Sequence, residues 1–199
     1  TQGYVRARLR LEWQIIHPAV YLTHTGPPSR RQLEWAACLA AWPAALSHQT
    51  AVSELNLRNP GSLIHVAVPN SHRVRNLEGV RVHEMLAFRD RVQWAASPPR
   101  IVKEHAILDL ARHTIDEYGT IALLGEAVQA RITTAARLAR AVDSRLRVRH
   151  RDMVNGLLLD VEGGIRSALE FAYARKVERA HGLPVAKRQF HEGNRYRDA

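Results

Sequence analysis

The chain has 199 residues, of which 46% are hydrophobic, and it carries a formal net charge of +10 with an isoelectric point near 10.7. This length and apolar content predict one or two compact domains with a real core, plus partial elements. No run of apolar residues is long enough for a membrane span, and the first residues lack the pattern of a signal peptide. We therefore expect no membrane partner and a cytoplasmic location.

The single cysteine, Cys38, excludes an internal disulfide and a cysteine zinc site, and its apolar helix face predicts a small core residue. All but three of the 29 basic residues are arginines. The guanidinium fork suits phosphate contacts, although GC-rich coding also favours arginine. The net charge is therefore the better indicator of an anionic partner.

The charge is unevenly distributed. Residues 1–31 carry five arginines against Glu12 alone, residues 103–126 carry two basic and five acidic residues, and residues 130–151 carry seven arginines against Asp143. Such segregation favours surfaces with different roles, while the alternative is ordinary solvated helix faces.

The first 25 residues predict a helix followed by a small β-hairpin. Val5, Leu9 and Trp13 are spaced four apart, and three arginines at 6, 8 and 10 project around the other sides. Ile15–Ile16, a His17-Pro18 turn and Val20–Leu22 then read as two short strands. A helix followed by a hairpin is the back half of a winged helix, whose helix enters the major groove while its wing lies along phosphates.

The next segment predicts a mixed helical and extended region. Ser29 and Ser47 are expected to cap two helices, the second reading HQTAVSELNL. Residues 62–68 and 80–85 alternate apolar and polar side chains, which predicts a hairpin with neighbouring strands at 92–94 and 101–102.

After Pro98-Pro99 the pattern becomes helical. Apolar stripes run through 107–118 and 121–128, Thr133 or Thr134 caps a helix carrying Leu138, Val142 and Leu146, and residues 153–161 form a fourth helix. The fold class expected from these elements is α+β: a partial winged helix, a central α/β domain with a small antiparallel sheet and a helical bundle, and the start of a further α/β domain.

Several blocks resemble a known arrangement. WQIIHPAVYLTHTGPPSRRQLEWAACLAAW, LIHVAVPN, GVRVHE and HAILDLA are similar to the blocks of actinobacterial AbiEi-type antitoxins, which have a winged-helix N-terminus followed by an α/β domain. RITTAARLARAVDS, RSALEFAYARKVERAHGLPVAKRQ and YRD resemble longer relatives that append an endonuclease-like domain similar to very-short-patch-repair nucleases of the PD-(D/E)XK superfamily. The likeness covers nearly the whole chain and rests mainly on the order of the blocks.

The resemblance implies the domain boundaries and one tentative metal site. It divides the chain into a partial winged helix at 1–25, an AbiEi-like domain at 26–162 and the N-terminal part of an endonuclease-like domain at 163–199. Glu170 matches the family's first acidic position, and Asp198 matches a catalytic aspartate that binds a divalent metal. The acidic strand expected after it is missing, so the resemblance implies truncation at both ends and an incomplete Mg²⁺ site. An ion pair of Glu170 with Arg166 is the alternative reading.

DNA-binding and metal-binding candidates follow from these patterns. The expected DNA-binding residues are Arg6, Arg8, Arg10, Arg30, Arg31, Arg147, Arg149, Lys187 and Arg188. Arg145 and Arg151 would extend a second phosphate patch around 147 and 149. The eleven histidines show no HExxH or paired spacing, so no zinc site is expected, and His48 is interpreted as a packing residue. No cofactor is expected unless a nuclease needs Mg²⁺.

Three functions remain open at this stage. The first is a DNA-binding regulator of the AbiEi antitoxin kind, which represses its own operon and whose implied partners are double-stranded DNA and a nucleotidyltransferase-like toxin. The second is a Mg²⁺-dependent nuclease, incomplete in this chain. The third is an interaction protein whose acidic helices at 103–126 engage a basic partner or a second copy of the chain.

Overall fold

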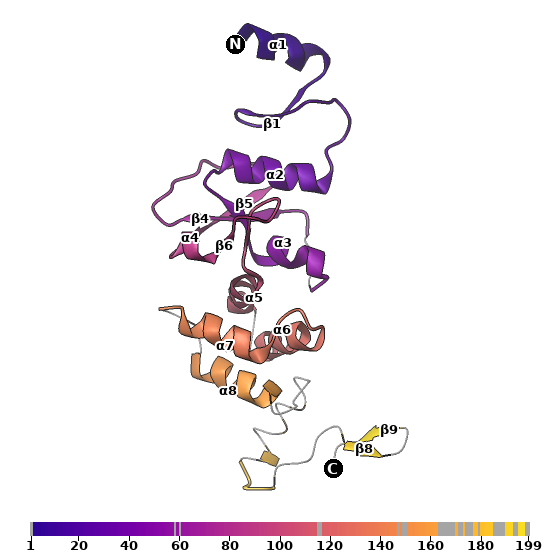
Figure 1. Cartoon of the computed structure of the whole chain (residues 1–199), viewed down its shortest axis with the longest axis vertical. Helices are drawn as coiled ribbons and strands as arrows, with labels where there is room; N and C mark the ends of the chain where they lie inside the picture. Colours follow the sequence, from indigo (N-terminus) through magenta and orange to yellow (C-terminus); the bar gives the residue numbers. More distant parts are fainter. Residues whose placement is uncertain are drawn as a thin grey trace. The chain divides into compact units, whose positions relative to one another are not determined.

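Figure 1 shows the computed structural model, which describes residues 2–57, 59, 61–114, 117–146, 148, 151–162, 170, 173, 177–178, 180–184, 190–192 and 195–197. Helices and short sheets make up the described part, which confirms the α+β class. The chain packs as two units, Thr1–Ala106 and Ile107–Ala199. None of the described helices is long and apolar enough to cross a bilayer.

The N-terminal helix and hairpin form as the sequence predicts. Helix α1 spans Gln2–Leu11, and strands β1 (Gln14–His17) and β2 (Val20–Leu22) pair antiparallel. The register shifts between Ile15 and His17, and Ala19 in the turn has a φ of 64°. Trp13, which was predicted to continue the apolar stripe of the helix, lies between the end of α1 and the start of β1.

A five-stranded sheet forms the centre of the first unit, in the order β5-β4-β3-β7-β6. Its strands are β3 (Ala45–Leu46), β4 (Ile64–Pro69), β5 (Val80–Met85), β6 (Val92–Gln93) and β7 (Arg100–Ile101). Strands β6 and β7 belong to the same sheet as β4 and β5 and pair antiparallel with each other, but β3 separates them from β4 and β5, so they are not the direct neighbours that the sequence predicts.

The expected hairpin of residues 62–68 and 80–85 is wrong. Strands β4 and β5 are adjacent but parallel, with Ile64 opposite Val80 and Pro69 opposite Met85. The connection through 70–79 returns the chain to the start of β4 before β5 begins. Alternation identifies the two faces of a strand but contains no information about its direction, so this reversal could not be seen in the pattern.

Helices α2 (Arg30–Ala40) and α3 (His48–Val52) pack against strands of the sheet, and a 3₁₀ turn η1 (Ser53–Leu55) extends α3. Ser29 forms the predicted cap, a reciprocal capping box with Gln32. Ser47 precedes α3 but makes no side-chain cap hydrogen bond, which corrects the expectation.

Small and branched apolar residues fill the core of the first unit. The most completely buried include Ala37, Cys38, Leu46, Val66, Val68 and Ile101. Burial raises the pKa of the Cys38 thiol to about 12, so the group stays neutral and behaves as a small hydrophobe, as the sequence predicts.

The second unit is mainly helical. Helix α5 (Lys103–Arg112) crosses the boundary between units and is followed by α6 (Glu117–Gln129), α7 (Ala135–Asp143) and α8 (Arg151–Glu162), the last packing on both α6 and α7. Thr134 caps α7 through the backbone N–H of Arg137.

Two apolar residues do not follow the predicted stripes. Tyr118 belongs to α6 and not to the stripe of α5, and Leu146 lies beyond α7 with 92% of its surface exposed. Strands β8 (Phe190–Glu192) and β9 (Arg195–Arg197) pair antiparallel further along the chain. Residue 163, the predicted start of the endonuclease-like segment, lies outside the described residues.

Candidate functional site

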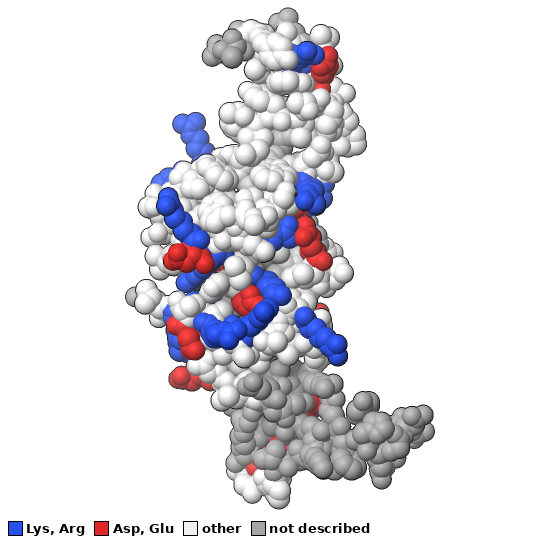
Figure 2. Space-filling model, viewed as in Figure 1, with Lys and Arg blue, Asp and Glu red and all other residues white. Residues whose placement is uncertain are grey.

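Basic residues on the surface stand beside acidic ones in several places. Figure 2 shows Lys and Arg side chains on the visible face with Asp and Glu side chains next to several of them. The ion pairs of the described residues include Arg8–Glu12, Arg73–Glu84 and Arg100–Glu54. The net charge is therefore partly neutralised at individual sites, and a nucleic-acid interface must be sought residue by residue.

Helix α1 carries three of the predicted DNA-binding arginines. Arg8 is held within the helix, where its guanidinium pairs with Glu12 at 2.5 Å and donates to the Tyr4 hydroxyl at 3.2 Å. These two hydrogen bonds raise the pKa of Arg8, which stays charged. Positions 6 and 10 are one turn apart in α1, and the side chains there lie outside the described part of the chain.

Aromatic contacts join α1 to the hairpin. The ring of Trp13 lies 6.1 Å from that of Tyr4 on α1, in an edge-to-face arrangement, and 6.4 Å from that of Tyr21 on β2. Such pairs contribute about 0.5–1.5 kcal/mol each beyond their area burial. Helix and hairpin are thus linked through the Trp13 ring.

The hairpin also buries a titratable group, His17. The side chain is 7% exposed, and loss of solvent lowers its pKa, an effect that Glu78 partly opposes. The unfolded chain therefore binds a proton at a higher pH than the folded chain does. The stability contributed by neutral His17 is present above the unfolded pKa of about 6.5 and decreases as the pH falls below it.

We expect His17→Gln to reduce the loss of stability on acidification from pH 7 to pH 5, because glutamine does not titrate. The measurement is urea unfolding of both proteins at several pH values. Comparing the change between the two proteins removes the contributions of the other histidines. Identical pH profiles would show that His17 does not contribute.

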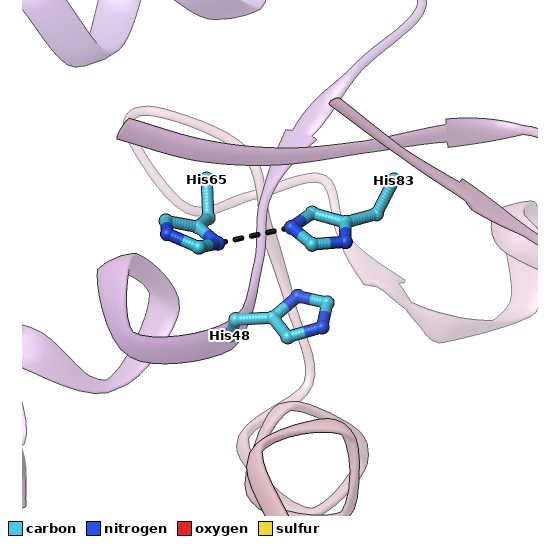
Figure 3. A group of neighbouring side chains, drawn as sticks. All are labelled: His48, His65 and His83. Carbon is cyan, nitrogen blue, oxygen red and sulfur yellow. Dashed lines mark hydrogen bonds between the residues drawn. The ribbon is translucent and has the colours of Figure 1, made fainter. Parts of the chain in front are cut away.

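Three histidines converge at one place in the first unit, which the sequence reasoning did not predict. His48, His65 and His83 each offer a ring nitrogen, and these three atoms all lie within 4.8 Å of one another. Figure 3 shows the three rings close together, with His48 from α3, His65 from β4 and His83 from β5. The Nδ1 of His65 and the Nε2 of His83 are 2.9 Å apart and share a hydrogen bond.

The histidine cluster is close-packed. The rings of His48 and His83 stack with centroids 3.8 Å apart, and those of His65 and His83 lie 5.1 Å apart. His48 is buried, whereas the other two are half-buried. The backbone of His48 has a φ of 49°, a left-handed conformation that is uncommon for any residue with a side chain.

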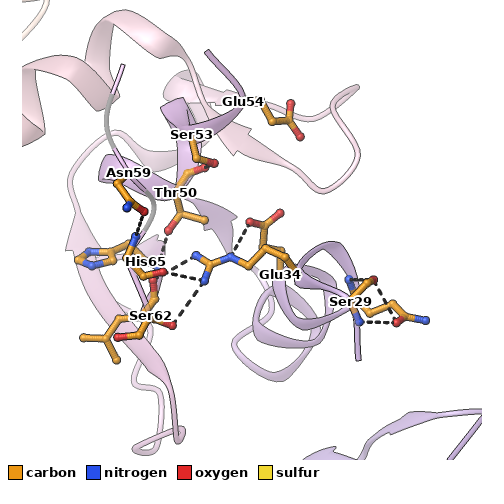
Figure 4. Close-up of polar contacts among 12 residues, drawn as sticks. Ser29, Glu34, Thr50, Ser53, Glu54, Asn59, Ser62 and His65 are labelled. Atoms are coloured by element: carbon orange, nitrogen blue, oxygen red, sulfur yellow. Dashed lines mark hydrogen bonds and ion pairs between the residues drawn. The ribbon is translucent and has the colours of Figure 1, made fainter. Parts of the chain in front are cut away.

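Backbone hydrogen bonds hold the cluster in place. The N–H of Ser47 donates to the carbonyl of His65 at 2.8 Å, and the N–H of His65 donates to the hydroxyl of Thr50 at 2.9 Å. Figure 4 shows Thr50 and His65 in this contact. The amide Nε2 of Gln49 lies 2.8 Å from the Nε2 of His65 and completes the surroundings of that ring.

Arg30, a predicted DNA contact, makes hydrogen bonds and an ion pair within the first unit. Its guanidinium donates to the carbonyl oxygens of Gly61, Ser62 and Leu63 at 3.1 to 3.4 Å. It also pairs with the Glu34 carboxylate at 3.1 Å, and Glu34 is only 7% exposed. Arg30 therefore ties α2 to the loop before β4, as the contacts around Glu34 and Ser62 in Figure 4 show.

Of the other predicted DNA contacts, Arg31 makes one hydrogen bond within the chain and four residues lie outside the described part. Arg31 is exposed and donates to the carbonyl of Ser97 at 2.8 Å. The predicted residues Arg147, Arg149, Lys187 and Arg188 lie outside the described residues.

Arg145 and Arg151 hold the connection between α7 and α8. Arg145 pairs with Asp109 of α5 at 2.8 Å, and both side chains are largely buried, with exposures of 10% and 14%. Arg151 donates to the carbonyl oxygens of Val142 and Arg145. Both guanidinium groups thus have structural contacts within the second unit.

The predicted carboxylates give no assembled metal site. Glu170 is described and half-buried, whereas Asp198 lies outside the described residues. Among the described residues, the histidine cluster is the group with converging metal-ligand atoms. The Mg²⁺ site implied by the resemblance therefore stays a prediction.

A surface pocket of about 370 Å³ lies elsewhere in the first unit. Trp42, Pro43, Phe88, Arg89 and Trp94 line it, and the Trp94 ring contacts those of Trp42 and Phe88. Its lining is mostly aromatic and offers no constellation for acid–base or nucleophilic chemistry.

A search of protein-family models and of curated proteins gives no match to this chain.

Proposed function

We propose that this chain binds double-stranded DNA through α1 and the β1–β2 hairpin and acts as a transcriptional regulator of the AbiEi antitoxin kind. The observation that carries the proposal is the position of Trp13, whose ring contacts Tyr4 of α1 and Tyr21 of β2. A basic helix that is joined to the following hairpin through an aromatic side chain is consistent with a recognition helix and its wing.

The charge supports an anionic partner. The net charge of +10 favours association with the phosphate backbone, and α1 contains three arginines in ten residues. Arg6 and Arg10 are the best candidates for phosphate or base contacts because they are one helical turn apart, whereas Arg8 is paired with Glu12.

The test is duplex binding measured by fluorescence anisotropy across a salt series, with DNA from upstream of the gene and a scrambled duplex of equal length. If six to ten phosphates are contacted, affinity should fall about 10³-fold to 10⁵-fold between 50 and 200 mM salt. The double variant Arg6→Ala/Arg10→Ala should weaken binding and reduce the salt slope by about 2.

The single variants Arg6→Ala and Arg10→Ala are each compared with Arg140→Ala in α7, which removes the same single positive charge from the second unit. Arg140→Ala should leave the slope nearly unchanged. Absence of salt-sensitive duplex binding by the complete chain would contradict the proposal. Equal affinity for the upstream and scrambled duplexes would contradict the regulatory role while leaving nonspecific DNA binding in place.

A further inference from the structure

We propose that His48, His65 and His83 form a binding site for a divalent transition-metal ion of the Zn²⁺ class. Three imidazole nitrogens that lie within 4.8 Å of one another match the ligand type and number found in His₃ zinc sites, in which a water molecule supplies the fourth ligand. This site is independent of the DNA-binding proposal because its residues lie on α3, β4 and β5 and not on α1 or the hairpin.

The sheet fixes the relative positions of the three ligands. His65 and His83 lie on adjacent parallel strands, where Ala67 is opposite His83 and His65 is opposite Arg81, so both histidines belong to the same face. His48 lies two positions after the end of β3, and the hydrogen bond from the N–H of its neighbour Ser47 to the carbonyl of His65 holds it beside β4. A change in the register of any of these strands would separate the ligands.

The His65–His83 pair is close to the nitrogen spacing that an ion requires, whereas His48 must reorient. Two nitrogens at 2.0–2.1 Å from a tetrahedral zinc ion are about 3.3 Å apart. The Nδ1 of His65 and the Nε2 of His83 are 2.9 Å apart, so the ion would replace the proton that they share and open the pair by a few tenths of an ångström. The His48 ring stacks on His83 and must turn about its χ angles to aim its nitrogen at the ion.

Gln49 would set the tautomer of one ligand. Its Nε2 lies 2.8 Å from the Nε2 of His65, and so it donates a hydrogen bond that leaves the proton of His65 on Nδ1. For Nδ1 to bind a metal, that proton must move to Nε2, and the Gln49 amide must rotate to present its oxygen. Outer partners of this kind orient metal-bound imidazoles, and their loss weakens metal binding.

The left-handed backbone of His48 supports a role beyond packing. A φ of 49° at a buried residue is held by the surrounding structure, and strained conformations of this kind cluster at ligand sites. A bound ion would join α3 to β4 and β5 and would therefore stabilise the folded first unit over the unfolded chain.

The test is a titration of the tag-free full chain with Zn²⁺ by calorimetry, and with Co²⁺ by visible absorption, which reports tetrahedral coordination. We expect one ion per chain and an increase in the melting temperature with Zn²⁺ but not with Mg²⁺. His65→Asn and His83→Asn should each weaken Zn²⁺ binding at least about 100-fold, because each variant loses one of the three imidazole ligands. Gln49→Leu should weaken it about 10-fold to 100-fold.

His72→Asn is the matched control, since His72 is half-buried in the loop after β4 and outside the cluster. It should bind Zn²⁺ like the natural chain. Circular dichroism of each variant separates loss of the ligand from loss of the fold, and Gln49→Leu keeps the test decisive if a histidine variant fails to fold. Absence of binding, or equal binding by His83→Asn and His72→Asn, would overturn the site.

The pH dependence gives a second readout. Metal binding requires neutral imidazoles, so Zn²⁺ affinity should fall as the pH is lowered from 7.5 to 5.5, and the calorimetric heat measured under acidic conditions should depend on the ionisation heat of the buffer. A Zn²⁺ affinity that is constant between pH 7.5 and pH 5.5 would show that the bound ion is held by other groups.

Discussion

Replacing Arg145 by alanine should lower the free energy of unfolding of the second unit by about 3–5 kcal/mol, because it leaves a mostly buried carboxylate without its partner. Arg145 and Asp109 pair at 2.8 Å with side-chain exposures of 10% and 14%. The second carboxylate oxygen of Asp109 is buried and has no hydrogen-bond partner among the described residues, so the carboxylate depends strongly on this contact. Urea unfolding followed by circular dichroism measures the change.

The double variant Arg145→Ala/Asp109→Ala is the informative control. Removing both charges should restore much of the lost stability, because the desolvated carboxylate is then gone. Arg140→Ala, on the exposed part of α7, should change stability by less than about 0.5 kcal/mol. If Arg145→Ala and Arg140→Ala behave alike, the Asp109 pair contributes little and Arg145 is available for other contacts.

Arg30→Ala should destabilise the first unit by about 2–3 kcal/mol. Its guanidinium donates to three consecutive carbonyl oxygens at 61–63 and pairs with Glu34, which is 7% exposed. Hydrogen bonds to charged groups are stronger than neutral ones, and removal of the arginine leaves Glu34 in a largely buried position without its cation. Thermal or urea unfolding measures the effect.

The neighbouring residue supplies the control. Arg31→Ala removes the same charge from the same helix but breaks one exposed hydrogen bond, to Ser97, and should cost less than about 1 kcal/mol. If the two variants lose equal stability, Arg30 does not anchor α2. If Arg31→Ala weakens DNA binding without loss of stability, Arg31 belongs to the interface.

Local patterns predicted the elements that depend on local interactions. The cap at Ser29, the cap at Thr134, one of two candidate threonines, and a short antiparallel hairpin within one or two residues of its predicted bounds all form. Each depends on residues within a few positions of one another, so its determinants are contiguous in the chain. The burial of Cys38 followed in the same way from the apolar face of α2.

Contacts between residues far apart in the chain could not be predicted from the sequence. The pairing of β4 with β5 is parallel and not antiparallel, because the 70–79 connection returns the chain to the start of the sheet. Arg30 and Arg145 were expected to face phosphate, but Arg30 bonds the Gly61 carbonyl, 31 positions away, as well as the nearby Glu34, and Arg145 pairs with Asp109, 36 positions away. An arginine that pairs with a buried carboxylate looks, in sequence, like one that faces solvent.

The sequence by itself determined the α+β class, the ends of several helices, the basic N-terminal helix with its hairpin, and the inert buried cysteine. Only the tertiary structure brought together His48, His65 and His83, which are 17 and 18 positions apart and show no metal-binding spacing. Adjacent parallel strands and the turn after β3 create that proximity through backbone hydrogen bonds between distant segments. Side-chain convergence of this kind depends on register and strand direction, which a linear pattern does not contain.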